Sequence, residues 1–377
     1  MDKMKLKSAL YRILYKSTFL IAYAVSIGAC LGNNTGELII SSLIAAVVVV
    51  ITPETAMLPL LSGFLITLYE YNTVGIWGAK FSFILCAVIS AFLMRSNNLK
   101  KKLNENYILG SVSLSTAVIM TVLITTLYFG IGATGNTVME MIKSYRSLGF
   151  HPNWRGILYG TIVMVIMITF PRKFKKISKY ISSEFLALLA AFLLNLWLIP
   201  RGSVEVIPLL KEADYFPHNP LNAASMLSFN SIAVIFISGF ALSVLMVIAG
   251  AKNPERNSIY SSAAILLQAD TGYFFPSTAS IKFSDIIEGI ISALVMALWL
   301  IPSHGFERLP LSACAVVLIV SGWHNVKWGA IAKSFSSVRN AVLFFAVIAI
   351  SVLITPAFGI IGAFAISLIN ERKDKKI

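Results

Sequence analysis

The stretch SIAVIFISGFALSVLMVIAG, residues 231–250, carries no charged side chain over its whole length. A helix needs roughly 20 mostly apolar residues to cross the hydrocarbon core of a bilayer, so this stretch predicts a transmembrane helix. IIEGIISALVMALWLIP, residues 286–302, is similar, and shorter apolar stretches recur along the 377-residue chain. With 57% hydrophobic and 13% charged residues, the chain has too little polar surface for a soluble globule. We therefore expect an all-α membrane protein with many spans.

The net charge of +14 comes from basic residues that gather between the apolar stretches. By the positive-inside rule, such segments face the cytoplasm. This predicts a multi-pass protein of the plasma or inner membrane with both termini cytoplasmic, and anionic membrane lipids as partners rather than nucleic acid. The clusters are Lys3 to Lys16, Arg95 to Lys102, Arg172 to Lys179, Lys252 with Arg256, Lys327 to Arg339, and Arg372 to Lys376.

Because every basic cluster is expected on the cytoplasmic side, the chain must cross the membrane an even number of times between clusters. Cut in this way, it contains about fourteen segments. Several of them are too short for ordinary spanning helices, and interrupted backbone survives in a membrane only when it is buried in protein or lines a cavity. The longest outer connections are 133–153 and 201–228. The expected segments are 13–32, 37–52, 54–70, 74–94, 107–132, 154–170, 182–200, 229–250, 258–268, 270–281, 283–302, 309–323, 338–354 and 357–370.

Two of these short segments share a local pattern, VITPETAM at residues 50–57 and YFFPSTAS at residues 273–280. β-Branched and aromatic residues favour an extended chain, and so does the position before a proline. Proline also suits the first position of a helix. Each pattern therefore predicts a short strand followed by a half-helix that begins near Pro53 or Pro276.

The start of such a half-helix presents unpaired N–H groups and a partial positive charge, which favour an anion. The hydroxyls of Thr55, Ser277 and Thr278 would add direct ligands. Two half-helices in equivalent places would form a substrate site. The alternative is that the pattern recurs by chance and that both prolines only kink their spans.

Glu54 is an acidic residue at predicted membrane depth, where carboxylates are costly and usually functional. It is a candidate for coupling to Na⁺ or H⁺, or else a carboxylate that only caps the helix. The three cysteines and four histidines show no metal-ligand or nucleophile spacing. The sequence therefore predicts no enzyme activity, no metal and no cofactor.

With these breaks in place, the chain resembles the SulP family of inorganic anion permeases, which carry sulfate, bicarbonate or chloride. The resemblance rests on ITPETAMLPLLSG (51–63), TGYFFPSTASIK (271–282) and LPLSACAVVLIVSGWHNVKW (309–328), and more weakly on 153–177 and 355–364. It implies a small anion held between the half-helices of segments three and ten. The implied site residues are Thr55, Ala56, Ser277 and Thr278, with Tyr23 and Ser26 on segment one.

The same resemblance implies a 7+7 inverted repeat, a gate domain that moves against a core domain by alternating access, and often a homodimer. The expected divisions are a cytoplasmic segment 1–12, a first repeat 13–200, an extracytoplasmic loop 201–228, a second repeat 229–370 and a cytoplasmic tail 371–377. So short a tail leaves no room for the STAS domain common in the family, and we expect none.

The chain also departs from the family pattern. Segment one reads FLIAYAVS (19–26) without the usual Pro-Gln, and 229–250 lacks the carboxylate that the family often places there. A nucleobase permease of the same architecture and a non-transporting membrane scaffold therefore stay open as alternatives, with an efflux pump for organic acids as a more distant one.

Overall fold

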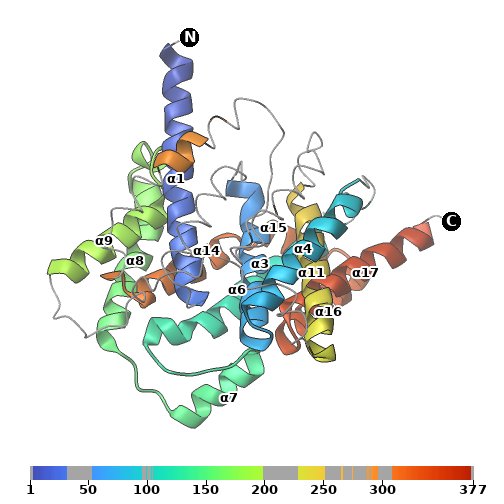
Figure 1. Ribbon diagram of the computed structural model, residues 1–377. Coiled ribbons are helices and arrows are strands. Elements are labelled where there is room, and N and C mark those ends of the chain that lie inside the picture. Colours follow the sequence, from blue (N-terminus) through green and yellow to red (C-terminus); the bar gives the residue numbers. More distant parts are fainter. Residues whose placement is uncertain are drawn as a thin grey trace.

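The computed structural model describes residues 3–31, 53–95, 105–197, 228–250, 290–295 and 308–374, with single residues at 99, 103, 265, 274 and 287. The regular elements of these residues are all helices (Figure 1). The predicted all-α class is therefore confirmed. The helices are α1 (Lys3–Leu31), α3 (Pro53–Thr73), α4 (Ile76–Leu93), α6 (Asn106–Phe129), α7 (Val138–Leu148), α8 (Trp154–Lys173), the 3₁₀ turn η1 (Ile177–Lys179), α9 (Ser183–Trp197), α11 (Phe229–Gly250), α14 (Leu311–His324), α15 (Trp328–Ser334), α16 (Val338–Leu353) and α17 (Pro356–Asp374).

Local chemistry explains several helix ends. The Asn153 side chain accepts hydrogen bonds from the amides of Arg155 and Gly156 and so caps the start of α8. Gly75, at φ 81°, turns the chain between α3 and α4, and Gly130, at φ 62°, ends α6. Both glycines take a left-handed backbone that other residues rarely adopt.

Among the described residues, α1, α6, α8 and α11 are long and apolar enough to cross a membrane. The pair α14 and α15 forms a span bent by 45°, and α4, α9, α16 and α17 are shorter apolar helices. These helices match the predicted segments closely. The segment predicted at 37–52, and most of 258–268, 270–281 and 283–302, lie outside the described residues, so the count of fourteen stays a prediction.

Two hydrophobic clusters form the interior. The first packs α1, α8, α9 and α14 together, and the second packs α4, α11, α16 and α17 together. α3 and α6 supply side chains to both clusters: on α3, Leu61 lies in the first and Ile66 in the second. α3 is therefore a central helix on which the two groups of helices meet.

Two basic clusters lie side by side. The ring of Tyr11 on α1 is 4.0 Å from the ring of Tyr180, which follows the basic turn between α8 and α9. α7 lies at the opposite end of the molecule from the N-terminus (Figure 1). The two basic clusters therefore lie at one end of the molecule and α7 at the other, and the side of the membrane that each end faces stays a prediction.

The stretch 133–153, predicted as a loop, contains the helix α7. Thr137 caps its start by accepting a hydrogen bond from the Glu140 amide. The helix is too short and too polar to be recognised as a span, which is why a search for long apolar stretches passes over it.

Candidate functional site

α3 begins at Pro53, the residue at which the sequence predicts the first half-helix to start. Four residues later, Met57 is buried in the first hydrophobic cluster, so the first turns of α3 lead directly into the protein interior. The side chains of Glu54, Thr55 and Ala56 lie outside the described part of the structure. Their roles as ligands or coupling group stay predictions.

The second predicted half-helix, with Pro276, Ser277 and Thr278, also lies outside the described residues. Phe274, two residues before Pro276, is described and is buried against the middle of α3. A methyl group added to Gly63 would lie only 2.1 Å from a ring carbon of Phe274. The Phe274 ring also stacks on Phe83 of α4, with 6.1 Å between ring centroids. This contact places Phe274, the one described residue of the second motif, alongside the helix that the first motif opens.

The predicted residues of segment one, Tyr23 and Ser26, are both buried on α1. The Tyr23 hydroxyl lies 2.6 Å from the Ser321 hydroxyl on α14 and donates a 3.3 Å hydrogen bond to Glu184 on α9. The Ser26 hydroxyl lies beside the Cys314 thiol and has no stronger partner among the described residues. Both side chains thus face α14. Tyr23 and Met57 belong to the same hydrophobic cluster, to which α1 and α3 both contribute.

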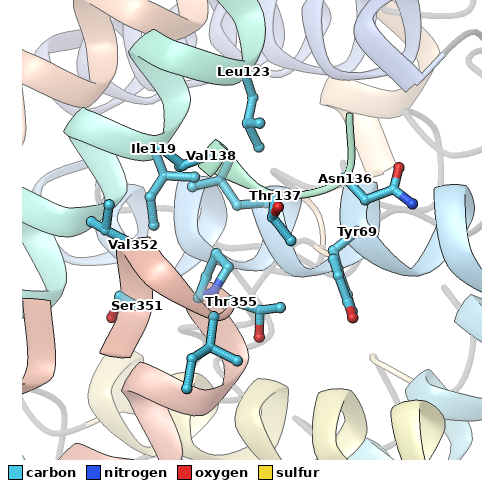
Figure 2. Close-up of a pocket in the computed structure, with 12 residues that line it drawn as sticks. Tyr69, Ile119, Leu123, Asn136, Thr137, Val138, Ser351, Val352 and Thr355 are labelled. Carbon is cyan, nitrogen blue, oxygen red and sulfur yellow. The ribbon is translucent and has the colours of Figure 1, made fainter. Parts of the chain in front are cut away.

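A pocket opens near the other end of α3, between α3, α6, the start of α7 and the turn that joins α16 to α17 (Figure 2). Its empty volume is about 230 Å³. The polar groups that line it are neutral, and the rest of its lining is apolar. The sequence analysis proposed none of the polar lining residues for a site, because they come from segments far apart in the chain. These polar residues are Tyr69, Asn136, Thr137, Ser351 and Thr355.

Glu70, in the last turn of α3, is another group that the sequence analysis did not single out. Its side chain is 0% exposed and lies between α4 and α11. The available signal was an acidic residue at the end of the apolar stretch LLSGFLITLYE, residues 60–70. Glu70 lies at the edge of the expected segment 54–70, and only the packing of α3, α4 and α11 shows that its carboxyl is buried.

The described helices therefore define a multi-pass membrane protein in which a central helix begins inside the molecule and joins two packed groups of helices. No family model matches the sequence, and no curated protein matches it. The structure does have solved counterparts.

The transmembrane domain of the cyanobacterial bicarbonate transporter BicA matches with a TM-score of 0.71 at 13% identity, over 96% of this chain and 98% of that one. SLC26A9 matches with a TM-score of 0.64 at 12% identity, over 98% of this chain and 66% of that one. The murine anion transporter Slc26a9 in its inward-facing state matches with a TM-score of 0.56 at 12% identity, over 99% of this chain and 69% of that one.

These counterparts are SulP/SLC26 anion transporters, so the resemblance predicted from the sequence motifs is confirmed at the level of the fold. Identities of 12–13% show a shared fold and leave the substrate to be argued from this chain's own residues.

Proposed function

We propose that this protein is a secondary active transporter of a small inorganic anion of the sulfate, bicarbonate or chloride class, working by alternating access. The observation that carries the proposal is the start of α3 at Pro53, inside a fold shared with anion transporters. In such a fold an interrupted span is tolerated because it lines a cavity, and its free helix end is a natural place for a substrate.

The chemistry of the proposed site is that of two helix N-termini. At the start of α3 the backbone N–H groups near Thr55 and Ala56 have no partner within the helix and carry the positive end of its dipole. The second motif would add Ser277 and Thr278 from the opposite side. Phe274 supports this arrangement, because it packs against Gly63 of α3 and lies two residues before Pro276 in the chain. Binding would need neither a cofactor nor a chemical step.

The moving parts would be the two groups of helices that meet on α3. Tyr23 of α1 is hydrogen-bonded to Ser321 of α14 and to Glu184 of α9, so these bonds join helices within the first group and would keep that group together as it moves against the second. Glu54 remains a candidate for ion coupling, and a homodimer in the inner membrane remains the expected assembly.

Uptake into proteoliposomes tests the proposal. Labelled sulfate, bicarbonate and chloride are each supplied to wild-type protein and to the double variant Thr55→Val, Ser277→Ala, with labelled uracil as a separate arm. We expect saturable uptake of one anion, reduced at least about tenfold in the double variant by the loss of two ligands, each worth roughly 1 kcal/mol or more when buried.

The matched control is the double variant Thr169→Val, Ser336→Ala, which removes two exposed hydroxyls and should transport like the wild type. Unaltered uptake in the site variant would place the anion elsewhere. Uptake of uracil alone would point to a nucleobase permease, and uptake of nothing would favour a scaffold.

A further inference from the structure

The Glu70 carboxyl is enclosed by hydroxyl groups on the side of α3 that packs against α4 and α11. The Ser82 hydroxyl of α4 is hydrogen-bonded to Glu70 Oε1. The Ser238 hydroxyl of α11 lies beside the carboxyl but outside hydrogen-bonding geometry. Glu70 Oε2 and Ser238 Oγ therefore both lack a hydrogen-bond partner among the described residues. All three side chains are at most 1% exposed.

Counting protons shows which form of the carboxyl fits this geometry. Ser82 Oγ lies within hydrogen-bonding distance of two acceptors, Glu70 Oε1 and the Ile235 carbonyl oxygen, the latter at 3.1 Å. A hydroxyl has a single proton to donate, so it cannot serve both acceptors. If Glu70 is a neutral acid, its own O–H donates to Ser82, and Ser82 donates to Ile235. Only the protonated carboxyl makes both contacts hydrogen bonds.

The charges around Glu70 favour the same form. α11 carries no ionisable side chain between Phe229 and Gly250, and none occurs on α17 before Glu371. On α4, Lys80 is two residues from Ser82 and hence about 200° around the helix, with its ammonium 5.0 Å from the ring centroid of Trp77.

The remaining ionisable neighbours are aromatic, lie on other faces or, like the buried thiol of Cys86 on the Ser82 face of α4, carry no positive charge. On α3 itself, Tyr69 lines the pocket of Figure 2, and Tyr71 follows Glu70. α6 carries only Tyr107 and Tyr128, near its two ends. Among the described residues no cation forms an ion pair with Glu70. A buried carboxylate without a cation is expensive, above all in a membrane.

We propose that Glu70 is a proton-binding site, occupied in this conformation and emptied when α3 and α11 shift against each other. When the proton leaves, the Ser82 and Ser238 hydroxyls both turn to donate to the carboxylate. Glu70 Oε2 and Ser238 Oγ, which lack partners in this conformation, then gain a hydrogen bond. Coupling of this proton to anion movement rests on the proposed function; its binding does not.

Infrared difference spectroscopy of the full-length protein in membranes tests the binding directly. We expect a carboxylic-acid C=O band that shifts in D₂O and disappears as the pH is raised. Glu70→Gln keeps the shape of the side chain and can still donate to Ser82, so it should fold, and it should lack the band. Glu140→Gln removes an exposed carboxylate of α7 and should keep the band. A wild type without the band, or a Glu70→Gln variant that retains it, would overturn the proposal.

Transport driven by an ion gradient tests the coupling. An inward proton gradient should stimulate anion uptake by the wild type, whereas uptake by Glu70→Gln should not respond to the gradient and its anion exchange at equal pH should persist. Stimulation that survives in Glu70→Gln would disprove the coupling. Stimulation by a sodium gradient that Glu70→Gln abolishes would overturn the choice of proton. If the wild type moves no anion, the proposed function fails, and the infrared band still decides whether Glu70 binds a proton.

Discussion

At the scale of single residues, Gly63 in the middle of α3 is in close contact with Phe274, which lies two residues before Pro276 in the chain. A Cβ at position 63 would fall 2.1 Å from the Phe274 ring, far inside van der Waals contact. We predict that Gly63→Ala destabilises the protein by about 1–3 kcal/mol through overpacking, although alanine is the better helix former. Thermal unfolding in detergent measures the effect.

The same contact predicts a coupling. Gly63→Ala combined with Phe274→Leu should be less destabilised than the sum of the two single variants, because the smaller side chain relieves the overlap. Gly329→Ala is the matched control, since nothing lies within 4 Å of a Cβ at that helical glycine. Strict additivity of the two changes would show that the Phe274 side chain does not pack against Gly63.

Tyr23 carries a second residue-scale prediction. Its hydroxyl is buried between Ser321 and Glu184, so Tyr23→Phe leaves both partners with one hydrogen bond fewer. We expect a loss of about 1–3 kcal/mol in unfolding free energy. Tyr128→Phe, which removes the exposed hydrogen bond to Thr161, should cost much less. Equal losses in the two variants would show that the bonds between α1 and α14 do not stabilise this conformation.

At the scale of helices, the sequence predicts most of what the structure describes. The span expected at 229–250 is α11 to the residue, and the half-helix expected near Pro53 begins there. Both succeed because a continuous apolar stretch and a proline act locally, before any tertiary contact. Glu70 was missed for the opposite reason. Its burial depends on α4 and α11 packing over it, which no local pattern records.

The helix α7 is intermediate between a helix that a local sequence pattern predicts and a residue whose burial only the packing shows. Its amphipathic face buries Val138 and Met141, while Met139 and Ile142 stay exposed, an arrangement typical of a helix that lies in the membrane interface. Tyr145 of α7 packs against the first hydrophobic cluster. Burial raises the pKa of Tyr145 to about 12, so its hydroxyl stays protonated throughout the neutral range.

The cap of α7 gives a prediction at this scale. Thr137→Ala removes the side-chain oxygen that accepts from the Glu140 amide, and loss of such a cap costs about 0.5–2 kcal/mol. We expect faster hydrogen exchange in the first turn of α7 and unchanged exchange in α8. Ser147→Ala, a change near the exposed end of the same helix, should leave the first turn protected. If Thr137→Ala leaves it equally protected, tertiary contacts rather than the cap hold α7.

At the scale of the whole molecule, α3 and α6 contribute to both hydrophobic clusters, so the two groups of helices are joined along a central seam. The chain resembles the SulP permeases only in scattered motifs. The motifs were sufficient to predict the fold, since each marks a helix start or a close contact. The anion and its ligands are different in kind, because the side chains proposed to bind it, Thr55, Ser277 and Thr278, lie outside the described part of the structure and stay predictions.

The membrane orientation is the prediction that concerns every helix at once. The basic turn at 172–179 and the N-terminal part of α1 lie together, and α7 lies at the far end (Figure 1). We therefore expect α7 outside the cell and the basic turn inside. The native cysteines at positions 86 and 314 are buried and Cys30 is half-buried, so an introduced cysteine can be read with little background.

Ser147→Cys on α7 and Lys176→Cys in the basic turn place single exposed thiols at these two ends. A maleimide that cannot cross membranes should label Ser147→Cys in intact cells, because α7 faces outward, and should label Lys176→Cys only after the membrane is opened. The opposite pattern would invert the orientation, and with it the direction in which the site at Pro53 first opens. Labelling of both variants in intact cells would contradict the crossings assigned to α8, whose two ends these residues flank.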